Sequence, residues 1–142
     1  GVGASEGVHD HAVGEVDDLL AVVEWSQEHY PDAKVLLAGF SFGSSVAAQA
    51  SHFVGADLAH LVLVAPPVER YPYDRDGLFP APVVVVAAEQ DELVDVAGLL
   101  SWAAALEGAS SVLRYKEASH FFHGFLAAVK RDLSQQLLAD LG

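Results

Sequence analysis

The sequence predicts a single α/β domain over residues 1–142, with helices on both faces of a mostly parallel sheet of about four strands, in three α/β/α layers. Four short aliphatic runs have the length of buried strands. Stretches with helical periodicity alternate with these runs, as in chains that form parallel sheets. The composition of 142 residues, 52% hydrophobic and 19% charged, is sufficient for one domain with a buried core.

The first expected element is a helix over residues 11–29, which Pro31 ends. Apolar residues recur in it at helical spacing, so they form a stripe along one face. The stripe consists of Val13, Val16, Leu19, Leu20 and Val23, with Trp25 as a further candidate, and it lies opposite Glu15, Asp17, Asp18 and Glu24.

The other elements alternate along the chain. Strands are expected over residues 35–38, 61–65, 83–88 and 111–115, and helices over residues 44–50, 94–106 and 122–141. One long irregular stretch lies between Pro66 and Pro82 and contains Tyr71, Tyr73 and Phe79. Loops of this length are often functional. This loop therefore forms either the wall or lid of a substrate pocket or a plain surface connection.

The most informative motif is Gly-Phe-Ser-Phe-Gly at residues 39–43, between an expected strand and an expected helix. A serine on such a sharp turn presents its hydroxyl at the carboxyl end of the sheet, where ligands of α/β folds bind. The helix is expected to begin at Phe42, whose backbone N–H would then face a developing oxyanion. The alternative is an ordinary turn in which Ser41 caps the helix.

Asp91 and His120 are the candidate partners of Ser41. Asp91 follows one apolar strand and His120 follows the last one. A serine hydroxyl is a weak nucleophile, so an imidazole must take its proton and a carboxylate must orient that imidazole. These three residue types at strand ends therefore indicate acyl transfer.

Several stretches together resemble the α/β-hydrolase fold, and most closely the small bacterial serine hydrolases and esterases related to dienelactone hydrolases. Residues 1–7 resemble a glycine-rich turn after the fourth strand, residues 39–43 the nucleophile elbow, residues 65–67 the end of the next strand, and residues 118–122 the histidine loop. The resemblance implies a Ser41–Asp91–His120 catalytic triad, an acyl-enzyme intermediate and short-chain carboxylic ester substrates. It covers the chain from end to end but corresponds only to the carboxyl-terminal part of the fold. Nothing in the chain resembles the first four strands or the loop that usually supplies a second oxyanion N–H.

Each candidate has a competitor nearby. Glu89 and Asp95 share an acidic loop with Asp91. The place of Asp91 in the resemblance favours it over these two as the carboxylate that orients the histidine. His123 lies three residues after His120 and could share a helical face with it, but His120 is nearer to the strand end. The remaining histidines, which are His9, His11, His29, His52 and His60, are expected to be surface or partly buried residues.

The net charge of −13, with only 7 Lys and Arg residues, argues against nucleic-acid binding. Such a surface suits neutral small-molecule esters better than anionic substrates. The absence of cysteine excludes disulfides, a thiol nucleophile and thiolate metal sites. His9-Asp10-His11 is only a weak metal signal. We therefore expect no metal and no cofactor.

No apolar run is long enough to cross a bilayer, and no charged segment precedes an apolar one at the start of the sequence. The default expectation is a cytoplasmic protein.

If the strand before Ser41 is the first of the sheet, one of its edges is long, apolar and unpaired. We therefore expect either a homo-oligomer that pairs through this edge or further strands of a longer polypeptide that cover it. A non-catalytic or split hydrolase remnant, acting as an interaction module, is the alternative to an active esterase.

Overall fold

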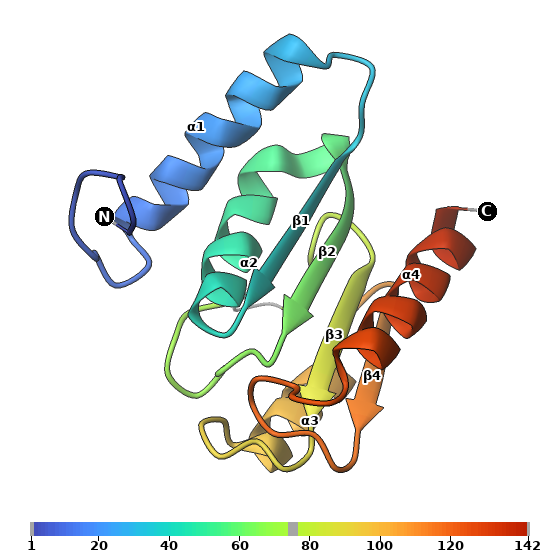
Figure 1. Ribbon diagram of the computed structural model, residues 1–142. Helices are drawn as coiled ribbons and strands as arrows, with labels where there is room; N and C mark the ends of the chain where they lie inside the picture. Colours follow the sequence, from blue (N-terminus) through green and yellow to red (C-terminus); the bar gives the residue numbers. More distant parts are fainter. Residues whose placement is uncertain (1, 74–76, 142) are drawn as a thin grey trace.

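The computed structural model describes residues 2–73 and 77–141, so Gly1 of the glycine-rich stretch and residues 74–76 of the long loop lie outside the described part (Figure 1). The elements are α1 (Gly14–His29), β1 (Val35–Phe40), α2 (Phe42–Val54), the 3-10 helix η1 (Gly55–Asp57), β2 (Leu58–Val64), β3 (Val83–Ala88), α3 (Val96–Ala104), β4 (Ser110–Tyr115) and α4 (Leu126–Leu141). The strands form one parallel sheet in the order β1-β2-β3-β4. The predicted α/β class is confirmed.

Helices cover both faces of this sheet (Figure 1), and an apolar core lies on each face. Leu61 and Leu63 of β2 pack on the face covered by α1, α2 and α3, with α1 lying along α2. Val62 and Val84 pack on the other face, beneath α4. Side chains alternate between the faces of a strand, so strands that are apolar at every position fill both cores. In the described residues, no helix has both the length and the apolar character needed to cross a membrane.

Helix α1 begins three residues later than the sequence predicts. His11 and Ala12 have positive φ angles of 50° and 71°, which end any helical path before Gly14. The Glu15 carboxylate accepts hydrogen bonds from the backbone N–H groups of Asp10 at 2.6 Å and Ala12 at 3.1 Å. This bonding fixes the tight turn that precedes the helix.

The apolar stripe of α1 is narrower than predicted. Val16 and Val23 are buried, whereas Val13 and Trp25 are 69% and 53% exposed and face away from the core.

The last helix also begins later than predicted, because Phe122 has a φ of 54° and turns the chain before α4.

Strand β1 lies at the edge of the sheet. Its side chains are more exposed than those of the buried strand that the sequence predicts here. Leu37 is buried against α2, but Leu36 and Phe40 on the opposite face are 44% and 41% exposed. Helix α4 covers that face only over the later strands. Among the described residues, β1 is paired with β2 alone, so its outer backbone edge is open.

We expect the isolated 142-residue chain to self-associate through this edge, because unpaired backbone groups on an apolar strand bind other strands. Leu36→Lys should raise the monomer fraction, since an edge lysine disfavours such pairing. Sedimentation velocity over a range of concentrations measures this fraction. Val22→Lys, at a 60% exposed position on α1, is the matched control. A clean monomer of the unchanged chain would contradict pairing between copies.

Candidate functional site

Ser41 lies on a sharp turn between β1 and α2. Its φ of 52° and ψ of −121° are unfavourable for a residue with a side chain. Its backbone N–H donates to the Val64 carbonyl at 2.8 Å, which continues the sheet pairing into the turn. A Cβ atom on Gly39 would lie 2.1 Å from the Gly43 carbonyl oxygen, so only glycine fits there. A Cβ on Gly43 would meet nothing within 4 Å, so the second glycine of the motif has no such steric requirement.

Asp91 lies in the loop that follows β3. Its Oδ1 accepts the backbone N–H groups of Leu93 at 2.8 Å and Val94 at 3.1 Å. Its Oδ2 lies 2.8 Å from His120 Nδ1, and only 2% of each of these two side chains is exposed. The Asp91 carboxylate is thereby held in a single orientation toward His120.

His120 lies in the loop after β4 and joins Asp91 to Ser41. Its Nε2 is 3.0 Å from Ser41 Oγ. An ionised carboxylate can only accept hydrogen bonds, so Nδ1 carries the proton that it donates to Asp91. Nε2 is then unprotonated and can accept the Ser41 hydroxyl. The rings of Phe40 and Phe121 each lie 5.0 Å from the imidazole and shield it from water.

Glu92, which the sequence did not single out, connects the loop of His120 to the loop of Asp91 by a hydrogen bond. Its Oε2 accepts the backbone N–H of His120 at 3.2 Å. Hydrogen bonds from its own N–H and from that of His120 hold the pKa of Glu92 below its ordinary value, although burial opposes this effect. Its position next to Asp91 is the only sequence signal that points to it.

The competing residues lie elsewhere. Glu89 pairs with Arg114, with 3.1 Å between Oε1 and Nε. Asp95 caps α3 by accepting the Gly98 N–H at 3.2 Å. His123 is exposed. The structure therefore brings Asp91 and His120, and none of these three competitors, to Ser41.

Phe42 opens α2, as predicted. Its N–H belongs to the first helical turn, where N–H groups have no carbonyl partner within the helix. Its ring contacts Tyr71 of the long loop, with centroids 5.2 Å apart, and His9 of the N-terminal segment at 4.8 Å. Aromatic groups from two loops thus gather beside Ser41, whereas Phe79 of the same long loop is buried in the core.

The weak metal signal around His9 has a structural explanation. Asp10 Oδ2 accepts the Gly14 N–H at 2.9 Å, and His9 Nδ1 lies 3.2 Å from Glu15 Oε1. In the described part of the chain, no three His, Asp or Glu side chains gather as metal ligands would.

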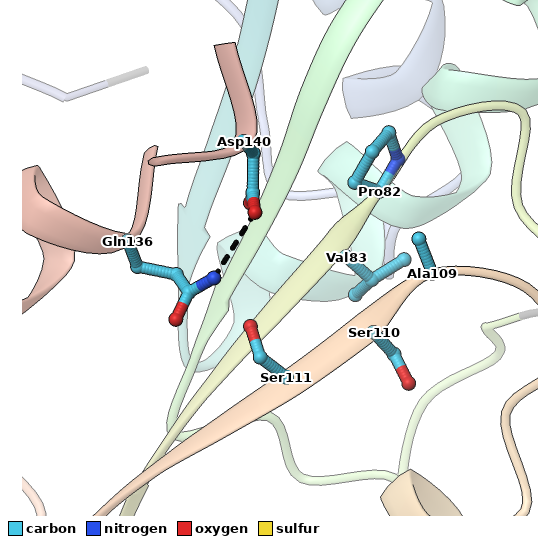
Figure 2. Close-up of a pocket in the computed structure, with 7 residues that line it drawn as sticks. All are labelled: Pro82, Val83, Ala109, Ser110, Ser111, Gln136 and Asp140. Carbon is cyan, nitrogen blue, oxygen red and sulfur yellow. Dashed lines mark hydrogen bonds between the residues drawn. The ribbon is translucent and has the colours of Figure 1, made fainter. Parts of the chain in front are cut away.

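A hollow of about 300 Å³ lies at the amino ends of β3 and β4, the end of the sheet away from Ser41 (Figure 2). Its lining includes Ser110 and Ser111 at the start of β4 and Asp140 near the end of α4. Asp140 accepts from Gln136 at 3.1 Å and lies 3.2 Å from Nε2 of the buried His60. Because the strands are parallel, this hollow is separated by the length of the sheet from Ser41.

Comparison with known proteins relates this geometry to a family. No known family model matches the chain. An uncharacterised protein of Rickettsia prowazekii is 33% identical in an alignment of 131 positions that covers 86% of this chain and 55% of that protein.

Two solved structures are each 34% identical to the chain. An α/β serine hydrolase homologue from Coxiella burnetii has a TM-score of 0.85 and is matched over 100% of this chain and 65% of its own. An α/β serine hydrolase without a lid from Xanthomonas campestris has a TM-score of 0.83, with 99% and 61% matched. The chain thus spans less than two thirds of the length of these relatives. By its sheet, its helical layers and these likenesses, the chain belongs to the α/β-hydrolase-fold superfamily.

Proposed function

We propose that the chain carries the catalytic centre of a serine hydrolase that cleaves carboxylic esters with short acyl groups. The observation that supports this proposal is the continuous hydrogen-bonded arrangement of Ser41 Oγ, His120 and Asp91, with distances of 3.0 Å and 2.8 Å. Ser, His and Asp in this arrangement are the groups that nucleophilic acyl transfer needs. The net charge of −13 favours neutral substrates.

In the first half of the reaction, Ser41 Oγ attacks the ester carbonyl carbon and its proton passes to His120 Nε2. Asp91 holds Nδ1–H and stabilises the imidazolium. The Phe42 N–H holds the negative carbonyl oxygen of the tetrahedral intermediate. When that intermediate collapses, the carbon–oxygen bond to the alcohol breaks, and the leaving oxygen takes the proton from His120.

In the second half, water attacks the acyl-serine ester and gives its proton to His120. The second tetrahedral intermediate breaks to release the carboxylic acid, and Ser41 Oγ regains a proton from Nε2. The rings of Phe40 and Phe121 contact His120, only 2% of whose side chain is exposed, and this environment strengthens the hydrogen bonds that hold charge.

A non-catalytic or split-hydrolase role is the second candidate. The chain spans 55% to 65% of its relatives' length, and nothing in it resembles the loop expected to supply a second oxyanion N–H. Loss of one oxyanion donor costs on the order of a hundredfold to a thousandfold in rate. Weak hydrolysis is therefore the expected outcome if the chain acts alone.

A fluorophosphonate probe, which reacts with activated serines, tests the proposed function. We expect the purified chain to be labelled at Ser41, with the adduct mapped by mass spectrometry. Ser41→Ala should remain unlabelled and should hydrolyse no p-nitrophenyl acetate, while unfolding at the same temperature as the unchanged chain. An unlabelled but folded chain would instead favour the split or non-catalytic role.

A further inference from the structure

A chain of hydrogen bonds outside the proposed triad ends on the backbone of Ser41. Ser44 Oγ lies 2.5 Å from the Ser41 carbonyl oxygen and 2.5 Å from the Tyr73 hydroxyl. Ser44 is fully buried in the first turn of α2, and Tyr73 comes from the long loop between β2 and β3. A residue 29 positions away along the sequence is thereby connected to the Ser41 turn.

The direction of these hydrogen bonds follows from their chemistry. The Ser41 carbonyl can only accept, so the single hydroxyl proton of Ser44 is donated to it. The Tyr73 hydroxyl must then donate to Ser44 Oγ. Burial raises the pKa of Tyr73 above its ordinary value, so the phenol keeps the proton that it donates. Consecutive hydrogen bonds of this kind strengthen one another in a buried environment.

The Ser41 carbonyl needs such support because the turn is strained. The φ of 52° at Ser41 is maintained only where several surrounding contacts hold the backbone in that conformation. The carbonyl accepts the Ser44 N–H at 3.0 Å in addition to the Ser44 hydroxyl. Two hydrogen bonds from one residue therefore fix the peptide that follows Ser41, and Tyr73 holds the side chain of that residue.

The adjacent Ser45 attaches the same loop to α2, but its side-chain hydrogen bonds do not involve Ser41. Its Oγ donates to the Pro72 carbonyl at 2.5 Å and accepts from Gln49 Nε2 at 3.1 Å. Ser45 is also fully buried. The loop is thus attached to α2 at two neighbouring points, and only the Tyr73 attachment continues to the Ser41 turn.

We propose that Tyr73 and Ser44 are positioning residues that hold the Ser41 carbonyl and thereby aim Ser41 Oγ at His120. This proposal rests on the proposed function, because it assigns these residues a role in serine reactivity. It also makes attachment of the long loop a condition for a reactive Ser41.

The experiment compares Tyr73→Phe and Ser44→Ala with Ser45→Ala as the matched control. The maximal rate of fluorophosphonate labelling should fall about tenfold or more in Tyr73→Phe and Ser44→Ala, because small misplacements of a nucleophile are costly. The probe concentration for half-maximal rate should stay unchanged. Ser45→Ala should destabilise the fold to a similar degree in thermal unfolding and yet be labelled at close to the unchanged rate.

The Ser41 carbonyl carbon resonance of isotope-labelled protein gives a readout that needs no reactivity. It should shift in Tyr73→Phe and Ser44→Ala, and should stay in place in Ser45→Ala. An unchanged resonance in Tyr73→Phe would overturn the positioning role, as would equal slowing of labelling in Ser45→Ala. If the unchanged chain does not react at all, the proposed function fails, and the resonance alone then decides whether Tyr73 acts on Ser41.

Discussion

Replacing His120 by alanine should abolish measurable ester hydrolysis, because loss of the histidine costs on the order of a millionfold in a complete serine hydrolase and this chain acting alone is expected to hydrolyse esters only weakly. His120 Nε2 is the only base within hydrogen-bond distance of Ser41 Oγ in the described structure, at 3.0 Å. Without it the serine proton has no acceptor in the attack, and the leaving alcohol has no donor. Initial rates with p-nitrophenyl acetate measure the loss.

His123→Ala is the matched control for this change. His123 lies three residues away in the same loop but is exposed, so its removal should leave the rate near that of the unchanged chain. Because His120 is buried between Phe40 and Phe121, thermal unfolding must accompany the rates. His120→Gln fills most of the imidazole volume and separates lost packing from lost chemistry. Comparable loss in His123→Ala would contradict the assignment of His120 as the base.

Replacing Gly39 by alanine should destabilise the protein by about 3 kcal/mol or prevent folding, a cost typical of an atom forced into a packed site. The new Cβ would lie 2.1 Å from the Gly43 carbonyl oxygen and 2.6 Å from Ser44 Cα. Both are backbone atoms, so the first turn of α2 would have to move away from β1. Ser41 immediately precedes that turn, so the substitution would displace Ser41 and also destabilise the protein.

Gly43→Ala is the control for Gly39→Ala, since its Cβ would meet nothing within 4 Å. We expect little change in its unfolding midpoint, or a small gain from the better helix propensity of alanine. Chemical denaturation followed by circular dichroism measures both variants. Equal destabilisation by the two substitutions would contradict the steric explanation.

The apolar runs were sufficient to predict the fold class and the positions of the strands along the chain. Val83–Ala88 agrees with the predicted boundaries, because this valine-rich run is too short for a buried helix and is bounded by Pro82 and Glu89. Helix starts were less predictable. His11, Ala12 and Phe122 take positive φ angles. In the turn before α1, hydrogen bonds to the Glu15 side chain stabilise these angles, and backbone propensity alone does not reveal them.

The relation of Ser41 to Asp91 and His120 could be predicted because each residue follows a strand, and the carboxyl ends of parallel strands lie at the same end of the sheet. The contributions of Tyr73 and Glu92 could not be predicted in this way. Each acts through a hydrogen bond that depends on how two loops meet, with sequence separations of 29 and 28 residues. No periodicity or motif in the sequence predicts such a contact between two loops.

The hydrogen bond between Ser41 and His120 joins residues 79 positions apart, from opposite edges of the sheet. During synthesis the chain emerges from its amino end, so Ser41 leaves the ribosome long before His120 does. Until the loop after β4 has been made and the domain has folded, the Ser41 hydroxyl lacks the imidazole that lies 3.0 Å from it in the complete structure. Under the proposed function, the nascent chain therefore carries an unactivated serine until the last strand and its histidine loop have been added.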